Sequence, residues 1–337
     1  MRLSIVSDEA SYDLESALEI MQECHCKEYV LRHLGLDLAP MVDERWVALA
    51  EKAMQLRRFR LTAIEADLFG AVSAVPQETA DIFVGGYTAG LLLLARRMQC
   101  STIVVAPPVA EPPREVYEDE DDDEVEDDDP DESVAETEAQ SEAAPAPAWR
   151  RMLQTLCASA AQANLQVLYK TEKQSLDTAL HHFRAVGAPN LGIDWDVAGS
   201  FGAGDDSGLS GVEDVLPHLK CVRVRGAIRK GRGAEWTSLE RGVIPWEDIL
   251  ELLYAGGYRG PVVLEPKLAP KLKEARAGLS LLGRWLDACR IKRRPEQDDD
   301  VEPDRIEDFD PKKRRAKSGR PGSGPEPKHR QGRPDRR

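Results

Sequence analysis

Four charged residues end four successive apolar segments in the second half of the chain: Lys170, Asp196, Arg223 and Glu265. If those segments are parallel strands of one sheet, their ends meet at one edge and the four side chains converge. Carboxylates beside fixed cations can move a proton at a substrate carbon or hold an anionic group. We therefore expect one site that combines acid–base chemistry with anion binding.

Neighbouring residues extend this candidate site. Side chains alternate along a strand, so Asp194 shares a face with Asp196, and Arg225 shares a face with Arg223. Glu172, two residues after Lys170, is added because it matches a second Glu in the strand-five motif of a family that the chain resembles. The candidate catalytic residues are therefore Lys170, Glu172, Asp196, Arg223 and Glu265, and the candidate substrate-binding residues are Arg32, Asp194 and Arg225.

Alternating strand and helix patterns must position these residues. Short apolar runs rich in β-branched residues predict eight strands, at 3–6, 28–32, 60–65, 102–106, 166–169, 191–196, 221–225 and 261–265. Between them, apolar residues recur every three or four positions, which predicts helices at 13–24, 44–55, 79–98, 150–163, 175–186, 212–219, 246–255 and 270–288. Eight such pairs predict a single (β/α)8 barrel of class α/β, while an open, doubly wound sheet remains the alternative.

Two segments of extreme charge stand apart from this pattern. Residues 111–142 hold eighteen Asp and Glu against one Arg, and residues 311–337 hold eleven Lys and Arg against two acids. Segments with so much charge and so little apolar surface do not offset the entropy of ordering. We predict a barrel formed by residues 1–110 and 149–290, a disordered acidic insertion at 111–148 after the fourth strand, and a disordered charged tail at 291–337.

The remaining composition suggests a reduced, aqueous compartment. The six cysteines are scattered, and Cys24-His25-Cys26 lacks a second half at zinc-site spacing. Residues 1–9 lack the long apolar core that is typical of a secretory signal, and the longest apolar run, 91–95, is far shorter than the ~20 residues that span a bilayer. We expect a cytoplasmic protein with no membrane contact, in which nucleic acid is a partner only through the basic tail around 312–315.

Several segments resemble a known family, the sugar phosphate isomerase/epimerase group of xylose isomerase-like TIM barrels, which is related to family 2 AP endonucleases. The resemblance covers nearly all of the predicted barrel and is most specific near its end. The segments that carry it are Ser7-Asp8-Glu9, Tyr29-Val30-Leu31-Arg32, Leu61-Thr62-Ala63-Ile64, Val186-Gly187-Ala188-Pro189-Asn190-Leu191, Leu239-Glu240-Arg241-Gly242-Val243-Ile244-Pro245-Trp246 and Gly257-Tyr258-Arg259-Gly260-Pro261 through Pro266.

The resemblance implies a divalent metal held by Glu, Asp, His and Glu from strands five to eight. Asp196 and Glu265 match the Asp and the last Glu, but Lys170 stands where the first Glu should be and Arg223 where the His should be. Gly199 stands where related epimerases often place a substrate-binding His. Because the two substitutions replace ligands with cations, we expect two ion pairs in place of the metal, and no cofactor.

Two functions remain open at this point. The family implies an isomerase or epimerase acting on a carbohydrate or its phosphate, here metal-independent or catalytically impaired. In such an enzyme Arg223 or Lys170 would be the electrophile, and Glu265 or Glu172 the base. The alternative is a non-catalytic barrel that binds a small carbohydrate or anionic ligand or serves as a scaffold.

Overall fold

The computed structural model describes residues 1–73, 80–106, 148–205, 209, 211–231 and 233–291. Most of the acidic segment (111–147) and the charged tail from residue 292 onward lie outside the described residues. The prediction that both segments are disordered therefore also concerns residues outside the described part of the chain.

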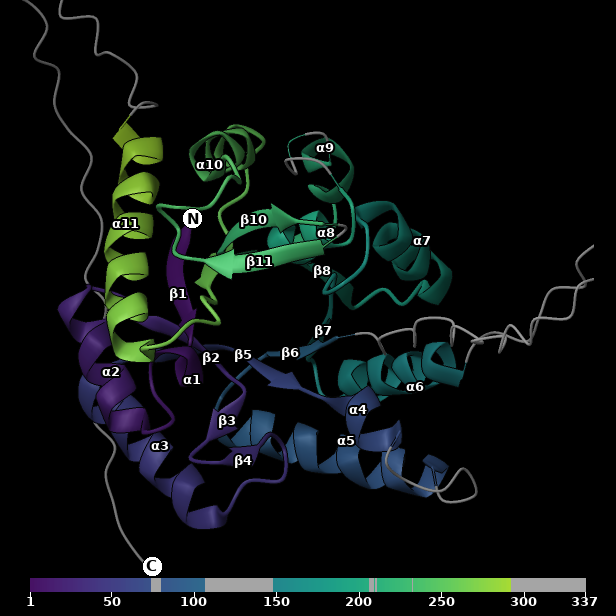
Figure 1. The fold of residues 1–337 in the computed structure, drawn as a ribbon. Helices are drawn as coiled ribbons and strands as arrows, with labels where there is room; N and C mark the ends of the chain where they lie inside the picture. Colours follow the sequence, from purple (N-terminus) through teal and green to yellow (C-terminus); the bar gives the residue numbers. More distant parts are fainter. Residues whose placement is uncertain (74–79, 107–147, 206–208, 210, 232, 292–337) are drawn as a thin grey trace, which may run out of the picture. The chain divides into compact units, whose positions relative to one another are not determined.

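Eight parallel strands form a closed barrel (Figure 1). Each strand pairs with the next along the chain, and β1 pairs with the last strand through Arg2–Pro261 and Ile5–Leu264. This closing pair rules out the open, doubly wound sheet and confirms the (β/α)8 barrel. In sequence order the barrel strands are β1 (Arg2–Val6), β2 (Glu28–Leu31), β5 (Arg60–Ala66), β6 (Thr102–Val105), β7 (Gln166–Lys170), β8 (Leu191–Asp196), β9 (Leu219–Val224) and β12 (Pro261–Leu264).

The helices that follow the strands surround the barrel. Residues at several of their ends satisfy backbone groups that lack a partner within the helix. In α7, the Ser175 side chain accepts a hydrogen bond from the backbone N–H of Thr178, and Gly187 ends the helix with φ 64°. These helices are α2 (Leu14–Glu23), α3 (Glu44–Arg57), α5 (Ala80–Arg97), α6 (Ala148–Gln162), α7 (Leu176–Val186), α9 (Val212–Val215), α10 (Trp246–Ala255) and α11 (Lys271–Ile291).

Short elements that the sequence analysis did not predict lie among the loops that follow the strands. They are the helices α1 (Ser7–Ala10), α4 (Leu68–Ser73) and α8 (Val197–Gly202), and the hairpins β3–β4 (His33–Leu34 with Asp37–Leu38) and β10–β11 (Gly226–Lys230 with Gly233–Thr237). In a barrel of this kind such loops surround the mouth at the carboxyl ends of the strands. They therefore shape any site that is built there.

The barrel interior is layered. Its apolar layer consists of one buried side chain from each of seven strands: Val6, Val30, Ala63, Val104, Leu168, Cys221 and Val263. Because side chains alternate along a strand, the residue two positions later faces the same interior, one layer nearer the mouth. After six of these seven residues that position is charged, and the charged residues are Asp8, Arg32, Glu65, Lys170, Arg223 and Glu265.

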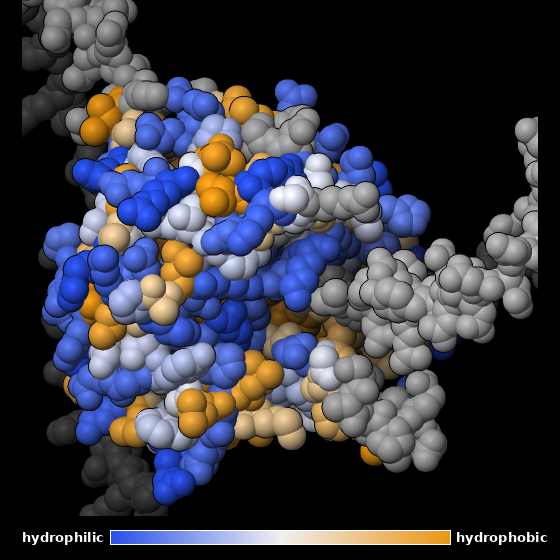
Figure 2. All heavy atoms as spheres, in the orientation of Figure 1, coloured by the Kyte–Doolittle hydropathy of each residue, from blue (hydrophilic) through white to orange (hydrophobic). Residues whose placement is uncertain are grey.

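The face shown in Figure 2 is mostly hydrophilic, with separate hydrophobic areas in its lower part, where β3, β4 and α5 lie in Figure 1. Large exposed apolar side chains on these elements include Leu36 on the β3–β4 turn and Ile82 and Leu93 on α5. Among the helices of the described residues, none combines the length and the apolar character needed to cross a membrane.

Candidate active site

A buried network of charged side chains fills the mouth of the barrel. Lys170, Asp194, Asp196, Arg223, Arg225 and Glu265 all have no solvent-exposed surface. The structure thus brings Lys170, Arg223 and Glu265 together, as their positions at the ends of strands suggest. Their partners, however, differ from the two simple ion pairs expected from the sequence.

Lys170, the last residue of β7, has three carboxylate neighbours. Its Nζ lies 2.9 Å from an oxygen of Glu65, 3.1 Å from one of Glu172 and 3.2 Å from one of Glu265. Burial alone would lower the pKa of Lys170, but Glu265 and Glu65 outweigh that effect, so the pKa is raised. Lys170 is therefore a fixed cation at this site.

Arg223 on β9 contacts three carboxylates, of which Glu65 and Glu265 also contact Lys170. Its Nη2 lies 2.5 Å from Asp194 Oδ2, and its Nη1 lies 2.8 Å from Glu65 Oε2 and 3.3 Å from Glu265 Oε2. Asp194, which was not among the four residues expected to form the ion pairs, is thus the β8 carboxylate that Arg223 binds. Burial acts to lower the pKa of Arg223, but Asp194, Glu65 and Glu265 raise it well above its ordinary value.

Asp196 and Arg225 form a separate pair with each other. Arg225 Nη2 donates to Asp196 Oδ2, while Asp196 Oδ1 accepts from the backbone N–H of Gly199, 3.0 Å away. The Arg225 guanidinium also stacks over the ring of Trp236 on β11, at 4.4 Å. Asp196 therefore binds the first turn of α8 and Arg225, and does not contact Lys170 or Arg223 through any of these bonds.

Arg32, which follows β2, forms ion pairs with carboxylates on α1 and with Glu265 of the network. Its Nη2 lies 2.6 Å from both Asp8 Oδ2 and Glu9 Oε1 on α1, and its Nη1 lies 3.0 Å from Glu265 Oε1. Burial opposes the charge, but Glu65, Glu265 and Asp8 raise the pKa of Arg32. Arg32 thus holds α1 over the barrel mouth.

The loop after β12 contributes Lys267, which contacts three carboxylates of the network. Lys267 Nζ lies 2.5 Å from Glu172 Oε1 and 3.4 Å from Glu265 Oε1, and its backbone N–H donates to Glu9 Oε2. Glu172 is therefore held between Lys170 and Lys267. Burial would raise its pKa, but these two lysines lower it, so Glu172 remains ionised.

The sequence analysis missed several members of the network. Glu65, which bonds both Lys170 and Arg223, ends the predicted strand 60–65 but was not among the predicted site residues, which came from the second strand and from the fifth to the eighth. Its place two residues after the interior Ala63 is the signal that could have found it. Asp8 has the same signal after Val6, whereas nothing in the sequence marks Lys267.

This arrangement does not fit the divalent metal that the family resemblance implies. Such an ion needs several free oxygen or nitrogen ligands at about 2.0–2.6 Å. Here the oxygens of Glu65 and Glu265 accept hydrogen bonds from Lys170 and Arg223, whose charges repel a cation. Within the described ranges, no group of three or more His, Cys, Asp or Glu side chains is arranged to hold a metal ion.

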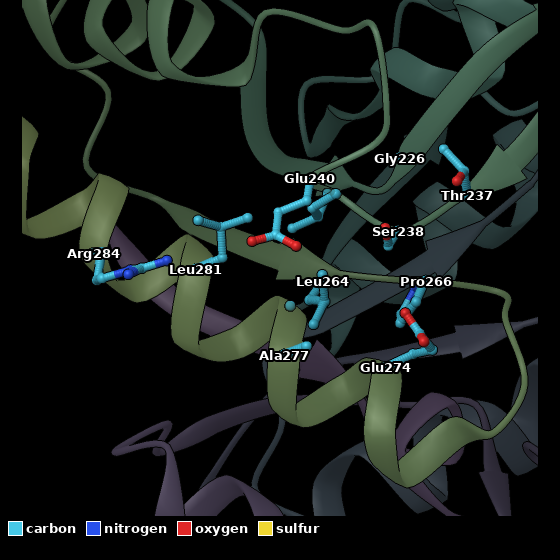
Figure 3. Close-up of a pocket in the computed structure, with 12 residues that line it drawn as sticks. Gly226, Thr237, Ser238, Glu240, Leu264, Pro266, Glu274, Ala277, Leu281 and Arg284 are labelled. Carbon is cyan, nitrogen blue, oxygen red and sulfur yellow. The ribbon is translucent and has the colours of Figure 1, made fainter.

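Two cavities lie near this region. One, of about 210 Å³, opens between the loop after β7, α8 and β11, and is lined by Glu172, Gly199, Arg225 and Trp236 among others. The other, also about 210 Å³, lies between α11, β12 and the loop after β11 (Figure 3). Its lining mixes apolar residues with Glu240, Glu274 and Arg284 and includes none of the candidate site residues, so of these two cavities only the first adjoins the network.

Comparisons with known proteins agree with the barrel geometry. The family described as xylose isomerase-like TIM barrel matches residues 33–288. No curated protein matches the chain.

Similar solved structures share the fold at low sequence identity. A xylose isomerase domain protein from Planctomyces limnophilus is 18% identical, with a TM-score of 0.61 over 86% of this chain and 96% of that one. An L-ribulose 3-epimerase is 15% identical, with a TM-score of 0.61 over 86% and 96%. A xylose isomerase-like TIM barrel protein from Mycobacterium smegmatis, in complex with magnesium, is 13% identical, with a TM-score of 0.58 over 86% and 97%. From the family match over most of its length, this chain belongs to the xylose isomerase-like TIM barrel family.

Proposed function

We propose that this protein is a sugar isomerase/epimerase-like barrel that has lost metal-dependent catalysis and binds a small carbohydrate or anionic ligand at its mouth. The observation that supports this most strongly is the position of two cations, Lys170 and Arg223, between the carboxylates of Glu65 and Glu265. The side chains of Lys170 and Arg223 neutralise the buried carboxylates of Glu65 and Glu265, which is the role that a divalent ion would have at this position.

The chemistry that the family resemblance implies needs accessible groups. A base removes a proton from the carbon beside a carbonyl, and an electrophile stabilises the enediolate that forms. Lys170, Arg223 and Glu265 are bonded within the network, have no exposed surface and, unlike Arg225, line neither of the two cavities. A substrate cannot touch them while the network is intact, which favours a binding role over an isomerase reaction.

A metal-independent isomerase is the second candidate, and one observation favours it. Glu172 and Arg225 line the same cavity, so a carboxylate base and a cationic electrophile are both available there. Against this, the lowered pKa of Glu172 makes it a weak base, because Brønsted behaviour favours a base whose pKa lies near the working pH. Exchange of substrate hydrogen in D2O, lost in Glu172→Gln, would support this candidate.

The proposed loss of the metal is tested by loading the protein with metal ions. Protein treated with a chelator is incubated with Mn2+, Mg2+ or Zn2+, desalted and analysed for metal, and its thermal unfolding midpoint is measured in parallel. We expect less than one-tenth of an ion per chain and no rise in the midpoint. A near-stoichiometric ion that also raises the midpoint would refute the proposal.

A further inference from the structure

The cavity between the loop after β7, α8 and β11 has features of a ligand site. It holds about 210 Å³, less than the roughly 300–1,000 Å³ of pockets for drug-sized ligands, so its occupant must be small. Glycines line one side of it. A Cβ atom on Gly202 would lie 3.4 Å from the Cβ of Ala234 and 3.9 Å from the Trp236 ring, so a larger side chain there would project toward the hairpin wall.

Gly199 lines the same side of the cavity. A Cβ atom at this position would lie 2.6 Å from Asp196 Oδ2, a distance that real Cβ atoms do not tolerate. A side chain at position 199 would therefore require a shift of the Asp196 carboxylate, which Arg225 holds.

Arg225 lines the same cavity, and within the described part of the chain some of its side-chain donors lack a hydrogen-bond partner. Its side chain is fully buried and lines the cavity, and among the described residues its Nε and Nη1 have no hydrogen-bond partner. A buried donor left without a partner costs about 1–3 kcal/mol. A ligand oxygen that reached one of these nitrogens from the cavity would supply that partner, most favourably if the oxygen is charged.

The other charges around the cavity permit an anion. Glu172 also lines it, but this carboxylate is neutralised by Lys170 and Lys267. Lys173, an exposed lining residue, adds a positive charge. The Trp236 ring offers an apolar face for a short carbon skeleton beside the charged group.

We propose that this cavity binds a small molecule carrying a carboxylate or phosphate group, recognised by Arg225 and packed against Trp236. The assignment deepens the proposed function and rests on it in one respect, namely that no metal ion takes part in holding the ligand. The recognition differs from that of a neutral sugar, because one charged group supplies most of the binding energy.

The experiment titrates the full-length protein by calorimetry in a buffer containing EDTA. The probes are inorganic phosphate, malonate and, as a neutral molecule of similar size, glycerol. We expect saturable binding of phosphate, malonate or both, and none of glycerol; the preferred anion identifies the ligand class. Binding of neither anion would overturn the proposal. Anion binding that appears only when EDTA is replaced by Mn2+ would overturn the metal-free proposed function as well.

Variants locate the binding. Gly202→Leu fills the cavity without altering Arg225 and is expected to weaken anion binding at least about tenfold. Gly85→Leu is the matched control, because its new side chain lies on an exposed face of α5 with nothing within 4 Å of the added Cβ atom. Arg225→Lys keeps the charge but loses the planar group, and should weaken binding about tenfold. Unchanged affinity in both Gly202→Leu and Arg225→Lys would show that the anion binds elsewhere.

Discussion

Arg223 Nη1 and Glu65 Oε2 lie 2.8 Å apart, although they stand on β9 and β5, which are opposite each other in the closed barrel. This ion pair therefore crosses the interior of the barrel. Lys170 on β7 makes a second such link, because its Nζ contacts both Glu65 and Glu265. The charged layer thus connects strands that share no backbone hydrogen bonds.

Removing Glu65 should destabilise the protein strongly. Glu65→Gln leaves Lys170 and Arg223 buried with one carboxylate fewer, and breaking one partner of a buried pair costs about 3–5 kcal/mol. We expect a loss of about 3 kcal/mol in the free energy of unfolding, measured by urea denaturation. The control, Glu23→Gln, breaks the half-exposed pair with Arg276 and should cost less than about 1 kcal/mol. Equal costs would mean that the network contributes no more than a surface ion pair.

The network should lose stability in acid. Burial raises the pKa of Glu65, but Arg223 and Lys170 outweigh this and lower the pKa to about 2, below the ordinary 4.5. A lowered folded-state pKa contributes stability above the ordinary value, and that contribution is lost as pH falls from about 4.5 toward 2. Thermal unfolding midpoints should therefore fall across this range, less steeply in Glu65→Gln. Parallel pH profiles for the two proteins would contradict the assigned role of Glu65.

Restoring the family's ligand types should restore metal affinity. Lys170→Glu with Arg223→His removes two cations and adds two donors beside Glu265. We expect Mn2+ to raise the unfolding midpoint of this double variant but not that of the wild type. Lys230→Glu with Arg259→His makes the same charge changes at exposed positions and should not respond. A response in this control as large as in the double variant would point to nonspecific attraction.

Arg32 should be needed to hold α1 in place. Arg32→Lys keeps the charge but cannot bridge Asp8, Glu9 and Glu265 at once. We expect about 2 kcal/mol lower stability and faster amide hydrogen exchange in residues 7–11. Arg57→Lys, which changes the pair with the exposed Glu15, is the control and should alter neither. Unaltered exchange at 7–11 in Arg32→Lys would show that α1 does not depend on this residue.

The sequence predicted the barrel well because its signal is repeated. Each of the eight strands was predicted within about two residues of its observed limits, since every barrel strand is a short apolar run and every crossover contains a periodic helix. The hairpins β3–β4 and β10–β11 were missed. They are short, and a turn residue such as Gly231 (φ 58°) is a weaker signal than a repeated strand–helix pair.

The pairing within the site could not be predicted from strand ends alone. The β8–β9 register shifts between Ile193 and Asp194, which sets Asp194 opposite Cys221 and within reach of Arg223. A shift of this kind depends on packing between strands and leaves no mark in the sequence. Lys267 was also missed. It lies in a loop, with a left-handed backbone conformation (φ 54°), and the strand pattern says nothing about where a loop residue points.

A crystal structure of the wild-type protein grown with Mn2+, with anomalous data collected at the manganese edge, shows whether a metal ion or the two cations lie among the buried carboxylates. We expect no anomalous peak within the charged layer, with Lys170 and Arg223 lying between Glu65 and Glu265. An anomalous peak bound to Glu265 and Asp196, with Lys170 and Arg223 displaced from their carboxylate partners, would contradict this expectation.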